Sequence, residues 1–397
     1  MTGVPGRSAL STPAHISGSA RTAVATPLRA LFLGSGYAGH STRFENLRGH
    51  IGDDPRLDSS WRLVTGWRHG GIVERIPGLP RGVKGRARAA SELLPLLSWP
   101  RPDVIWSSAG STDLALLAWS FGGPFDRPFV LDLDWTLDQR EEFAPWYYGR
   151  PPRTGLFARM NRARESAVWR NVTMFTPWSE WAADALRRRG VEESRIHVLP
   201  PGVDVEYWKP EAERNALDEA SPDRPLRLLF VGGDFRRKGG ELLLEVMRSP
   251  LGERLQLDIV TREEVPSTPN VTVHRLNPNT PELRALYQRA DLFILPSLAE
   301  CFGIATIEAM ATGLPVVVSD RGASREIVEH GRSGWLIEPT AQDLADRLSA
   351  ILSNLSGLQG MGAQARATAV AHFNGVTNDA RVADLLCDLS TRKLTNG

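Results

Sequence analysis

The stretch LPSLAECFGIATIEAMATGLPVVVSD, residues 295–320, places two carboxylates where they could bind a polyhydroxylated ligand. Glu300 lies in the loop after an apolar strand, and Glu308 lies eight positions later on a predicted helix. Eight positions make just over two helical turns, so both carboxylates can face one cleft if the helix begins near Phe302. A carboxylate accepts two hydrogen bonds in a fixed geometry, which suits sugar and ribose hydroxyls. The alternative is an ordinary amphipathic helix with one exposed glutamate.

The first turn of this helix could bind an anion. A helix leaves the backbone N–H groups of its first turn without partners, and such groups bind phosphates well. The residues that would supply them here are Phe302, Gly303, Ile304 and Ala305.

A second phosphate-binding candidate is FVGGDFRRKGGE, residues 230–241, where a predicted strand ends at Gly232 and Gly233. Arg236, Arg237 and Lys238 follow, before a helix that starts after two further glycines. Cationic side chains beside a helix N-terminus favour a diphosphate. The Gly-Lys-Ser/Thr order of a Walker loop is absent. A solvated basic turn remains the alternative interpretation.

A third glycine-rich stretch, ALFLGSGYAGHS at residues 30–41, fits the spacing of a dinucleotide-binding fingerprint through Gly34, Gly36 and Gly39. An NAD site also needs a carboxylate at the end of the second strand. That predicted strand ends in Thr-Gly-Trp, and Asp53 and Asp54 lie in a polar loop before it. Two interpretations therefore remain beside NAD binding: a tight strand-to-helix turn, and a glycine loop that lines a cleft.

Strand-like and helix-like segments alternate along the chain, which predicts parallel sheets covered by helices. The first series has strands at 29–34, 61–66, 103–107, 128–134, 171–175 and 195–199, with helices at 43–51, 111–120 and 179–189. The second series has strands at 226–233, 255–260, 271–274, 291–295, 315–318 and 335–338, with helices at 240–248, 281–289, 304–312 and 341–353. Two such units form a cleft, and ligands bind at the carboxyl ends of their strands.

The bulk composition narrows the function classes. A chain of 397 residues is too long for one ordinary core and predicts two domains. The net charge of +1 gives no electrostatic case for nucleic acid, so no nucleic-acid partner is expected. The two cysteines, Cys301 and Cys387, form no metal or disulfide pattern. No apolar run is long enough to span a membrane.

The motifs together resemble the family-4 retaining glycosyltransferases of GT-B architecture. The likeness extends from about residue 28 to residue 373, through TPWSEWAADALRRRGVEESRIHVLPPGVDVEYWKP before the linker, VGGDFRRKGG, the signature at 295–320 and HGRSGWLIEP after it. It implies that Lys238 binds the donor diphosphate, Glu308 the nucleotide ribose and Glu300 the transferred sugar.

The resemblance also supplies the candidate site. Many members carry Gly-Arg where this chain has Gly232-Gly233, so the second cation must come from Arg236 or Arg237. Many have a histidine after the fourth strand, where this chain has Asp134. The catalytic candidates are thus Glu300, Lys238 and Asp134. The donor-binding candidates are Gly36, Gly39, Gly233, Arg236, Arg237, Lys238, Leu276, Glu300, Phe302, Gly303, Ile304, Ala305 and Glu308.

Asp132 and Asp134 could instead be the metal-binding acids of a GT-A glycosyltransferase, but that scheme has no place for the second sheet and its glutamates. We therefore expect an α/β protein of GT-B fold, with two Rossmann-like doubly wound domains facing a central cleft. The expected division is a disordered leader (1–27), an acceptor-binding domain (28–200), a linker (201–225), a nucleotide-sugar-binding domain (226–373) and a tail (374–397) that could be a helix crossing back to the first domain.

The expected activity is retaining transfer of a sugar from a nucleotide-sugar to a glycan, lipid-linked or small-molecule acceptor. No metal and no cofactor is expected, because Lys238, the arginines and a helix N-terminus can stabilise the phosphate charge. A sugar-nucleotide epimerase and a non-catalytic carbohydrate-binding relic are the alternatives. A cytoplasmic location is expected. Residues 61–100, with seven Lys/Arg against two Glu, could also contact the anionic inner face of a membrane.

Overall fold

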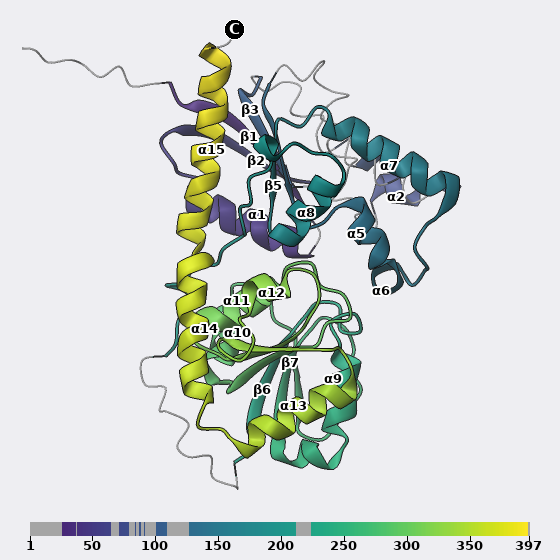
Figure 1. Cartoon of the computed structure of the whole chain (residues 1–397), viewed down its shortest axis with the longest axis vertical. Coiled ribbons are helices and arrows are strands. Elements are labelled where there is room, and N and C mark those ends of the chain that lie inside the picture. Colours follow the sequence, from purple (N-terminus) through teal and green to yellow (C-terminus); the bar gives the residue numbers. More distant parts are fainter. Residues whose placement is uncertain are drawn as a thin grey trace, which may run out of the picture.

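A computed structural model describes residues 26–36, 38–64, 71–78, 84, 87, 88, 91, 101–108, 127–211 and 224–395 (Figure 1). The expected helix at 111–120, most of the expected leader and most of the basic stretch 61–100 lie outside these residues. The described chain forms two parallel sheets, one of five strands and one of six. None of the described helices has both the length and the apolar composition needed to cross a bilayer.

The first domain is built on a five-stranded sheet in the order β2-β1-β3-β4-β5, and all neighbouring strands run parallel. Its strands are β1 (Leu28–Ser35), β2 (Leu57–Val64), β3 (Val104–Ser108), β4 (Phe129–Leu133) and β5 (Met174–Pro177). Its helices are α1 (Ala38–Ile51), α2 (Ile72–Arg75), α5 (Leu137–Glu142), α6 (Ala144–Tyr148), α7 (Gly155–Trp169) and α8 (Glu180–Arg188).

Alternating side chains of this sheet pack into two separate cores. Val130 joins Phe32 and Trp106 in a cluster with α1 and the C-terminal helix, whereas Phe129 and Leu131 join a cluster with α7 and α8. This alternation is the expected consequence of a strand buried on both faces. The hydrophobic run of β4 is therefore covered by helices on each side.

The second domain is built on a six-stranded parallel sheet in the order β11-β10-β9-β6-β7-β8. Its strands are β6 (Leu226–Val231), β7 (Leu255–Val260), β8 (Val271–His274), β9 (Leu292–Leu295), β10 (Val316–Ser319) and β11 (Gly334–Ile337). Its helices are α9 (Gly240–Met247), α10 (Pro281–Arg289), α11 (Ile304–Ala311), α12 (Ser324–Ile327), α13 (Ala341–Ser353) and α14 (Leu358–His372).

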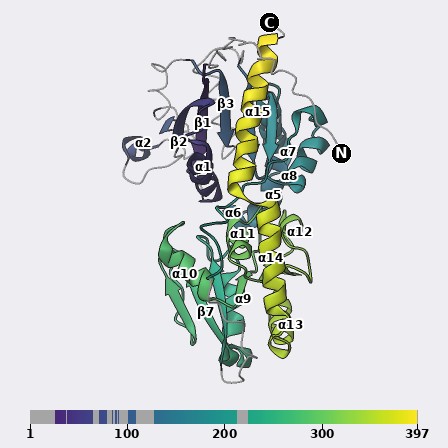
Figure 2. The same cartoon turned by 90° about the vertical axis from the view of Figure 1, so that its left-hand side faces the viewer.

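Helix α15 (Gly375–Thr395) leaves the second domain and packs on the first (Figures 1 and 2). Val382, Ala383 and Leu386 of α15 enter the same core cluster as Phe44 and Leu47 of α1. The chain thus crosses twice between the domains. The two crossings touch, because Val203 donates its N–H to Phe373 O at 3.0 Å and accepts from Gly375 N at 2.8 Å.

A buried charge cluster fixes α15 to α1. Arg43 forms an ion pair with Asp379, and both side chains are fully buried. His50 Nδ1 lies 2.6 Å from the other oxygen of Asp379. Both charges are buried away from water. Removing either partner would therefore leave the other charge buried and uncompensated, which destabilises the fold.

Two expected features of the first domain are wrong in detail. The segment 195–199 is not a strand: a 3₁₀ turn occupies Glu193–Arg195, and only Ile196 bridges to Phe175. Leu199 still donates its N–H to Pro177 O at 3.0 Å, but Pro177 of β5 has no N–H to donate in return, so the ladder ends there. The second strand begins at Leu57 rather than at residue 61 and ends at Val64.

Asp379→Ala should lower the free energy of unfolding by about 3–5 kcal/mol, because it leaves the buried Arg43 without a counter-charge. Eleven of the twelve tryptophans precede residue 226, so urea unfolding followed by tryptophan fluorescence reports mainly on the first domain. Asp384→Ala is the matched control, since it removes an exposed partner of Arg56 from the same helix. The control should lose less than about 1 kcal/mol. Equal losses in the two variants would contradict the importance of the buried pair.

Candidate functional site

The candidate site lies where the strand order of the second sheet reverses. Strands β6 and β9 are hydrogen-bonded neighbours, although they are far apart in sequence. Their carboxyl ends lead into the loops 232–239 and 296–303. Ligands of open parallel sheets bind at such a switch point. The topology therefore brings together the two stretches that the sequence singled out.

Lys238 and Glu300 form an ion pair between these two loops. Ser297 Oγ donates a further hydrogen bond to the same carboxylate oxygen at 3.2 Å. Burial opposes ionisation of Glu300, but Lys238 and Arg237 outweigh it and lower the pKa of the carboxyl. Burial, with help from Arg237, lowers the pKa of Lys238 despite its partner. Two of the three catalytic candidates are thus in direct contact.

The two arginines before Lys238 lie in different surroundings. Arg237 is buried, donates to Ala299 O at 2.9 Å and is held by Asp234 at 3.0 Å. Its guanidinium also lies 4.2 Å from the ring centre of Tyr147, which belongs to α6 of the first domain. Arg236 is largely exposed and pairs only loosely with Glu241 at 3.5 Å. Arg237 is therefore the arginine that accompanies Lys238.

Helix α11 begins at Ile304, the start of the helix predicted at 304–312. Gly303 precedes it with φ of 98°, a left-handed conformation that glycine adopts without strain. Within the described chain, the N–H groups of Gly303, Ile304 and Ala305 donate to no acceptor. Phe302 turns its ring against Trp178 of the first domain, 5.8 Å between centres. Residues 303–305, with the N–H of Phe302, which also has no acceptor among the described residues, form the candidate anion-binding turn.

Glu308 has a different partner from the Lys238–Glu300 pair. It is buried, and its carboxylate accepts a hydrogen bond of 2.9 Å from Tyr287 Oη. Burial raises the pKa of Glu308 to about 7, and the hydrogen bond from Tyr287 only partly opposes this. The two glutamates consequently differ in charge state near neutral pH. Leu276, another donor-binding candidate, is half-buried against the second-domain core.

The remaining candidates lie in the first domain. Asp134 follows β4 and pairs with His40 Nε2 at 3.0 Å, while His40 Nδ1 is buried and has no partner among the described residues. The His40 ring also packs on Trp178, the residue that contacts Phe302. Gly36 is exposed after β1 and bonds Val64 O at 3.0 Å, and Gly39 lies in the first turn of α1. Gly233 is exposed, with open space around it.

The NAD and GT-A interpretations fail on this geometry. Asp54 lies before β2 and pairs with Arg56, so it is at the wrong end of the strand to bind a ribose. Asp132 is buried, accepts from Thr176 Oγ1 at 3.1 Å and from Trp178 Nε1 at 2.6 Å, and is oriented into the fold. Burial raises the pKa of Asp132 to about 6. Asp132 and Asp134 therefore do not converge as a pair of metal ligands.

Sequence reasoning missed three residues of this region. His40 immediately follows the glycines of the first loop, and an ionisable side chain at that place was a usable signal. Tyr147 lies in the aromatic stretch FAPWYYGRPP. Its contact with Arg237 depends on how the two domains pack together, which the sequence does not show. Tyr287 looks like any apolar position of an amphipathic helix, so nothing local marks it as the partner of Glu308.

Two family models match the chain: "Glycosyl transferase 4-like domain" over residues 49–202 and "Glycosyl transferases group 1" over residues 225–354. The chain belongs to the group 1 glycosyltransferases. Among curated relatives of this glycosyltransferase, D-inositol 3-phosphate glycosyltransferase of Pseudarthrobacter chlorophenolicus is 31% identical over 221 residues, which is 49% of this chain and 50% of the relative. The alignment thus spans about half the length of such curated relatives.

Comparison with solved structures identifies the fold class of the glycosyltransferase. Sucrose-phosphate synthase of Thermosynechococcus elongatus superposes with a TM-score of 0.72 at 19% identity, over 92% of this chain and all of that one. HepE of Anabaena, in complex with UDP-glucose, superposes with a TM-score of 0.64 at 17% identity, over 91% of this chain and all of that one. The two parallel sheets are therefore the two halves of a GT-B fold, as the sequence predicted.

The pKa of Glu308 makes the glycosyltransferase's stability depend on pH. Since the pKa rises from 4.5 to about 7 on folding, the folded chain keeps a proton that the unfolded chain releases. The stability from the neutral carboxyl is complete below pH 4.5 and is lost as the pH rises through 7. Relative to Glu308→Gln, the wild-type free energy of unfolding should fall by about 3 kcal/mol across this window.

Urea titrations of both proteins at several pH values measure this difference, since groups unaffected by the substitution cancel. Tyr287→Phe removes the hydrogen bond that lowers the pKa of Glu308, so its transition should move to higher pH. A pH-independent difference between wild type and Glu308→Gln would show that folding does not raise the pKa of Glu308.

Proposed function

We propose that this chain transfers a sugar from a nucleotide-sugar donor to an acceptor hydroxyl with retention of anomeric configuration. The observation that carries the proposal is the Lys238–Glu300 pair at the switch point of the second sheet, beside the free amides of residues 303–305. A cation, an anion-binding turn and a buried carboxylate at one place suit a substrate that joins a diphosphate to a sugar. Family membership supports the same activity.

Each candidate then has a distinct task. Lys238, Arg237 and the amides at the start of α11 hold the diphosphate, because both cations and free N–H groups stabilise phosphate oxygens. Glu300 contacts the transferred sugar from its place beside Lys238. Glu308 accepts hydrogen bonds from the ribose hydroxyls, in part replacing the one that Tyr287 now provides. Arg236 stays in solvent and contributes only long-range charge.

The transfer step is same-face attack. The bond between the anomeric carbon and the phosphate oxygen breaks, and its electron pair goes to the diphosphate. The acceptor oxygen bonds the anomeric carbon on the face that the diphosphate leaves, and the acceptor proton goes to a leaving phosphate oxygen. Lys238 and the α11 amides stabilise the charge that develops on the diphosphate. Asp134, held by His40, orients a hydroxyl from the first-domain side.

The named relatives suggest which donor base and which acceptor to test first. UDP is the first base to test, since HepE, which shares the fold, is described in complex with UDP-glucose. An inositol phosphate is a reasonable first acceptor, because curated relatives carry D-inositol 3-phosphate in their names. Glycans and lipid-linked sugars complete the acceptor panel.

Incubation with UDP-, GDP- and ADP-sugars, with and without acceptors, tests the function and its metal requirement together. We expect one nucleotide class to raise the melting temperature and to be released only with a glycosylated product. EDTA should leave the rate unchanged, because protein cations and amides carry the phosphate charge. Epimerised donor without transfer, or neither reaction with any donor, would overturn the proposal. A strict need for manganese or magnesium would overturn the metal-independent donor geometry.

The two glutamates should separate binding from turnover. Glu308→Gln should weaken the free nucleoside diphosphate by about ten- to a hundredfold, since losing a charge-assisted hydrogen bond costs roughly 1.5–3 kcal/mol. Glu300→Gln should bind that nucleotide almost normally and lose kcat, because a carboxylate beside the sugar acts mainly as positive charge develops on the ring.

Calorimetry with the nucleotide and initial rates with donor and acceptor measure the two effects on the same preparations. Glu241→Gln is a suitable control, since this exposed residue borders the loop but touches only Arg236. If Glu300→Gln loses nucleotide affinity while Glu308→Gln keeps it, the two roles are assigned the wrong way round.

A further inference from the structure

An exposed apolar patch lies outside the donor site, on α6 and the first half of α7. Its members are 45–74% exposed, whereas comparable side chains elsewhere in the fold are mostly buried. They are Trp146, Tyr148, Leu156, Phe157 and Met160. Figure 1 shows α6 and α7 on the side of the first domain away from α15. We call this set, with the arginines described below, the α6–α7 surface.

Helix α7 is apolar on two opposite sides. Ala158, Val168 and Trp169 are buried toward the sheet. Leu156 and Met160 lie one turn apart on the other side and are exposed, and Ala163 continues their row. A solvated surface helix would carry polar residues on its outer side. The outer row of α7 therefore has the composition of a face that contacts something apolar.

The same segment is strongly cationic, although the whole chain has a net charge of only +1. Residues 143–170 contain six arginines and one acidic residue, Glu165. Arg159 and Arg164 are exposed on α7, beside the apolar row. Arg150 and Arg153 lie over the rings of Tyr148 and Phe157, 5.3 Å and 5.0 Å from their centres. Because Arg150 and Arg162 are paired with Glu141 and Asp138 of α5, the positive charge beside the exposed apolar side chains comes mainly from Arg153, Arg159 and Arg164.

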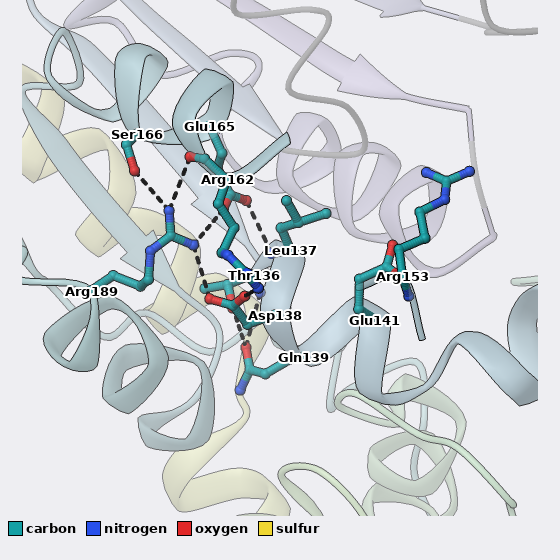
Figure 3. A network of polar contacts seen from close by, with 10 residues as sticks. All are labelled: Thr136, Leu137, Asp138, Gln139, Glu141, Arg153, Arg162, Glu165, Ser166 and Arg189. Atoms are coloured by element: carbon teal, nitrogen blue, oxygen red, sulfur yellow. Dashed lines mark hydrogen bonds and ion pairs between the residues drawn. The ribbon is translucent and has the colours of Figure 1, made fainter. Parts of the chain in front are cut away.

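A polar network holds this surface rigidly on the first domain (Figure 3). Arg189 of α8 donates to Glu165 at 2.9 Å and to Asp138 at 3.0 Å, which joins α7 and α5. Glu165 also accepts from the backbone N–H of Leu137, at 3.0 Å. Figure 3 shows Arg153 pointing away from this network. The exposed apolar row is therefore presented in a fixed orientation.

We propose that the α6–α7 surface binds the surface of an anionic lipid bilayer. Aromatic and aliphatic side chains beside arginines match a bilayer interface, where apolar groups enter the acyl boundary and cations contact anionic headgroups. A second copy of the chain fits this surface less well, because a twofold interface would bring its arginines against one another. The charge complementarity favours lipid over a self-contact.

The position of the patch also bears on the acceptor, a step that rests on the proposed function. Tyr147 lies between Trp146 and Tyr148, and its ring contacts Arg237 while its hydroxyl lies 3.6 Å from Cys301 Sγ. The α6 end of the α6–α7 surface therefore borders the donor site. Binding to a bilayer would hold this border at the lipid surface, which favours a lipid-linked acceptor over a free glycan.

Co-sedimentation with vesicles tests the proposal without any catalytic readout. The full chain should pellet with vesicles of equal phosphatidylcholine and phosphatidylglycerol, and remain in solution with phosphatidylcholine alone. Leu156→Asp/Met160→Asp should abolish pelleting. Arg159→Glu/Arg164→Glu should weaken it by at least about 25-fold, since each arginine near an anionic surface contributes about fivefold. High salt should weaken the wild type in the same direction.

Val370→Asp/Val376→Asp is the matched control, because these exposed valines lie on α14 and α15. It should pellet like the wild type. All variants should keep the wild-type melting temperature, so that lost binding is not lost folding. Wild-type pelleting of Leu156→Asp/Met160→Asp would overturn the proposal, as would equal binding to neutral vesicles. A concentration-dependent dimer in sedimentation velocity that these substitutions abolish would assign the surface to a second copy instead.

Discussion

The parallel pairing of β6 with β9 is the constraint on which the candidate site depends. The two strands are separated in sequence by β7, β8 and two helices, yet they are neighbours in the sheet. Their carboxyl ends therefore deliver Lys238 and Glu300 to one place, with the N-terminus of α11 beside them. A different strand order would leave the same residues far apart. The sheet thus brings two motifs that are distant in sequence into one site, which contains both a lysine and a glutamate.

The first domain completes this centre from the opposite side, and it is held there by the double crossing of the chain. Tyr147 contacts Arg237, Trp178 contacts Phe302, and Glu326 of α12 accepts the backbone N–H groups of Glu180 and Trp181 at the start of α8. Helix α15 anchors the second domain to α1 through the buried Asp379. Residues that contact the donor loops therefore come from both domains, although the two candidate donor loops belong to the second domain alone.

The sequence predicts the architecture well because parallel strands are nearly continuous apolar runs separated by helical patterns. Five of the six strands predicted in the first half correspond to strands of the first sheet or to parts of them, and all six predicted in the second half correspond to strands of the second sheet. The sequence did not predict helices α5, α6 and α7. Helices α5 and α6 are too short to show a clear apolar period, and α7 carries apolar residues on two opposite sides, which obscures its period. The failure at 195–199 reflects Pro177 of the neighbouring strand, whose missing N–H does not show in the hydrophobicity of 195–199 itself.

The site was harder to predict, because its partners come from different elements. The motifs located Lys238, Glu300 and Glu308, but the contacts of Glu308 with Tyr287 and of Asp134 with His40 depend on packing between distant segments. The start of α11 at residue 304 agrees with the predicted helix, and Gly303, in a left-handed conformation, ends the loop before its first turn. Spacing alone could not distinguish a carboxylate paired with a lysine from one that faces only a tyrosine.

That distinction is the main physical argument for giving the two carboxylates different tasks. Both are buried, so each bears a similar cost of ionisation, but only Glu300 has cations beside it. Its pKa is lowered, whereas that of Glu308 rises to about 7. A buried ion pair such as Lys238–Glu300 adds little net stability, because desolvation offsets most of the attraction. Its presence in the fold is therefore better explained by chemistry than by stability, while Glu308, which has a hydroxyl partner and no cation, suits the recognition of hydroxyl groups.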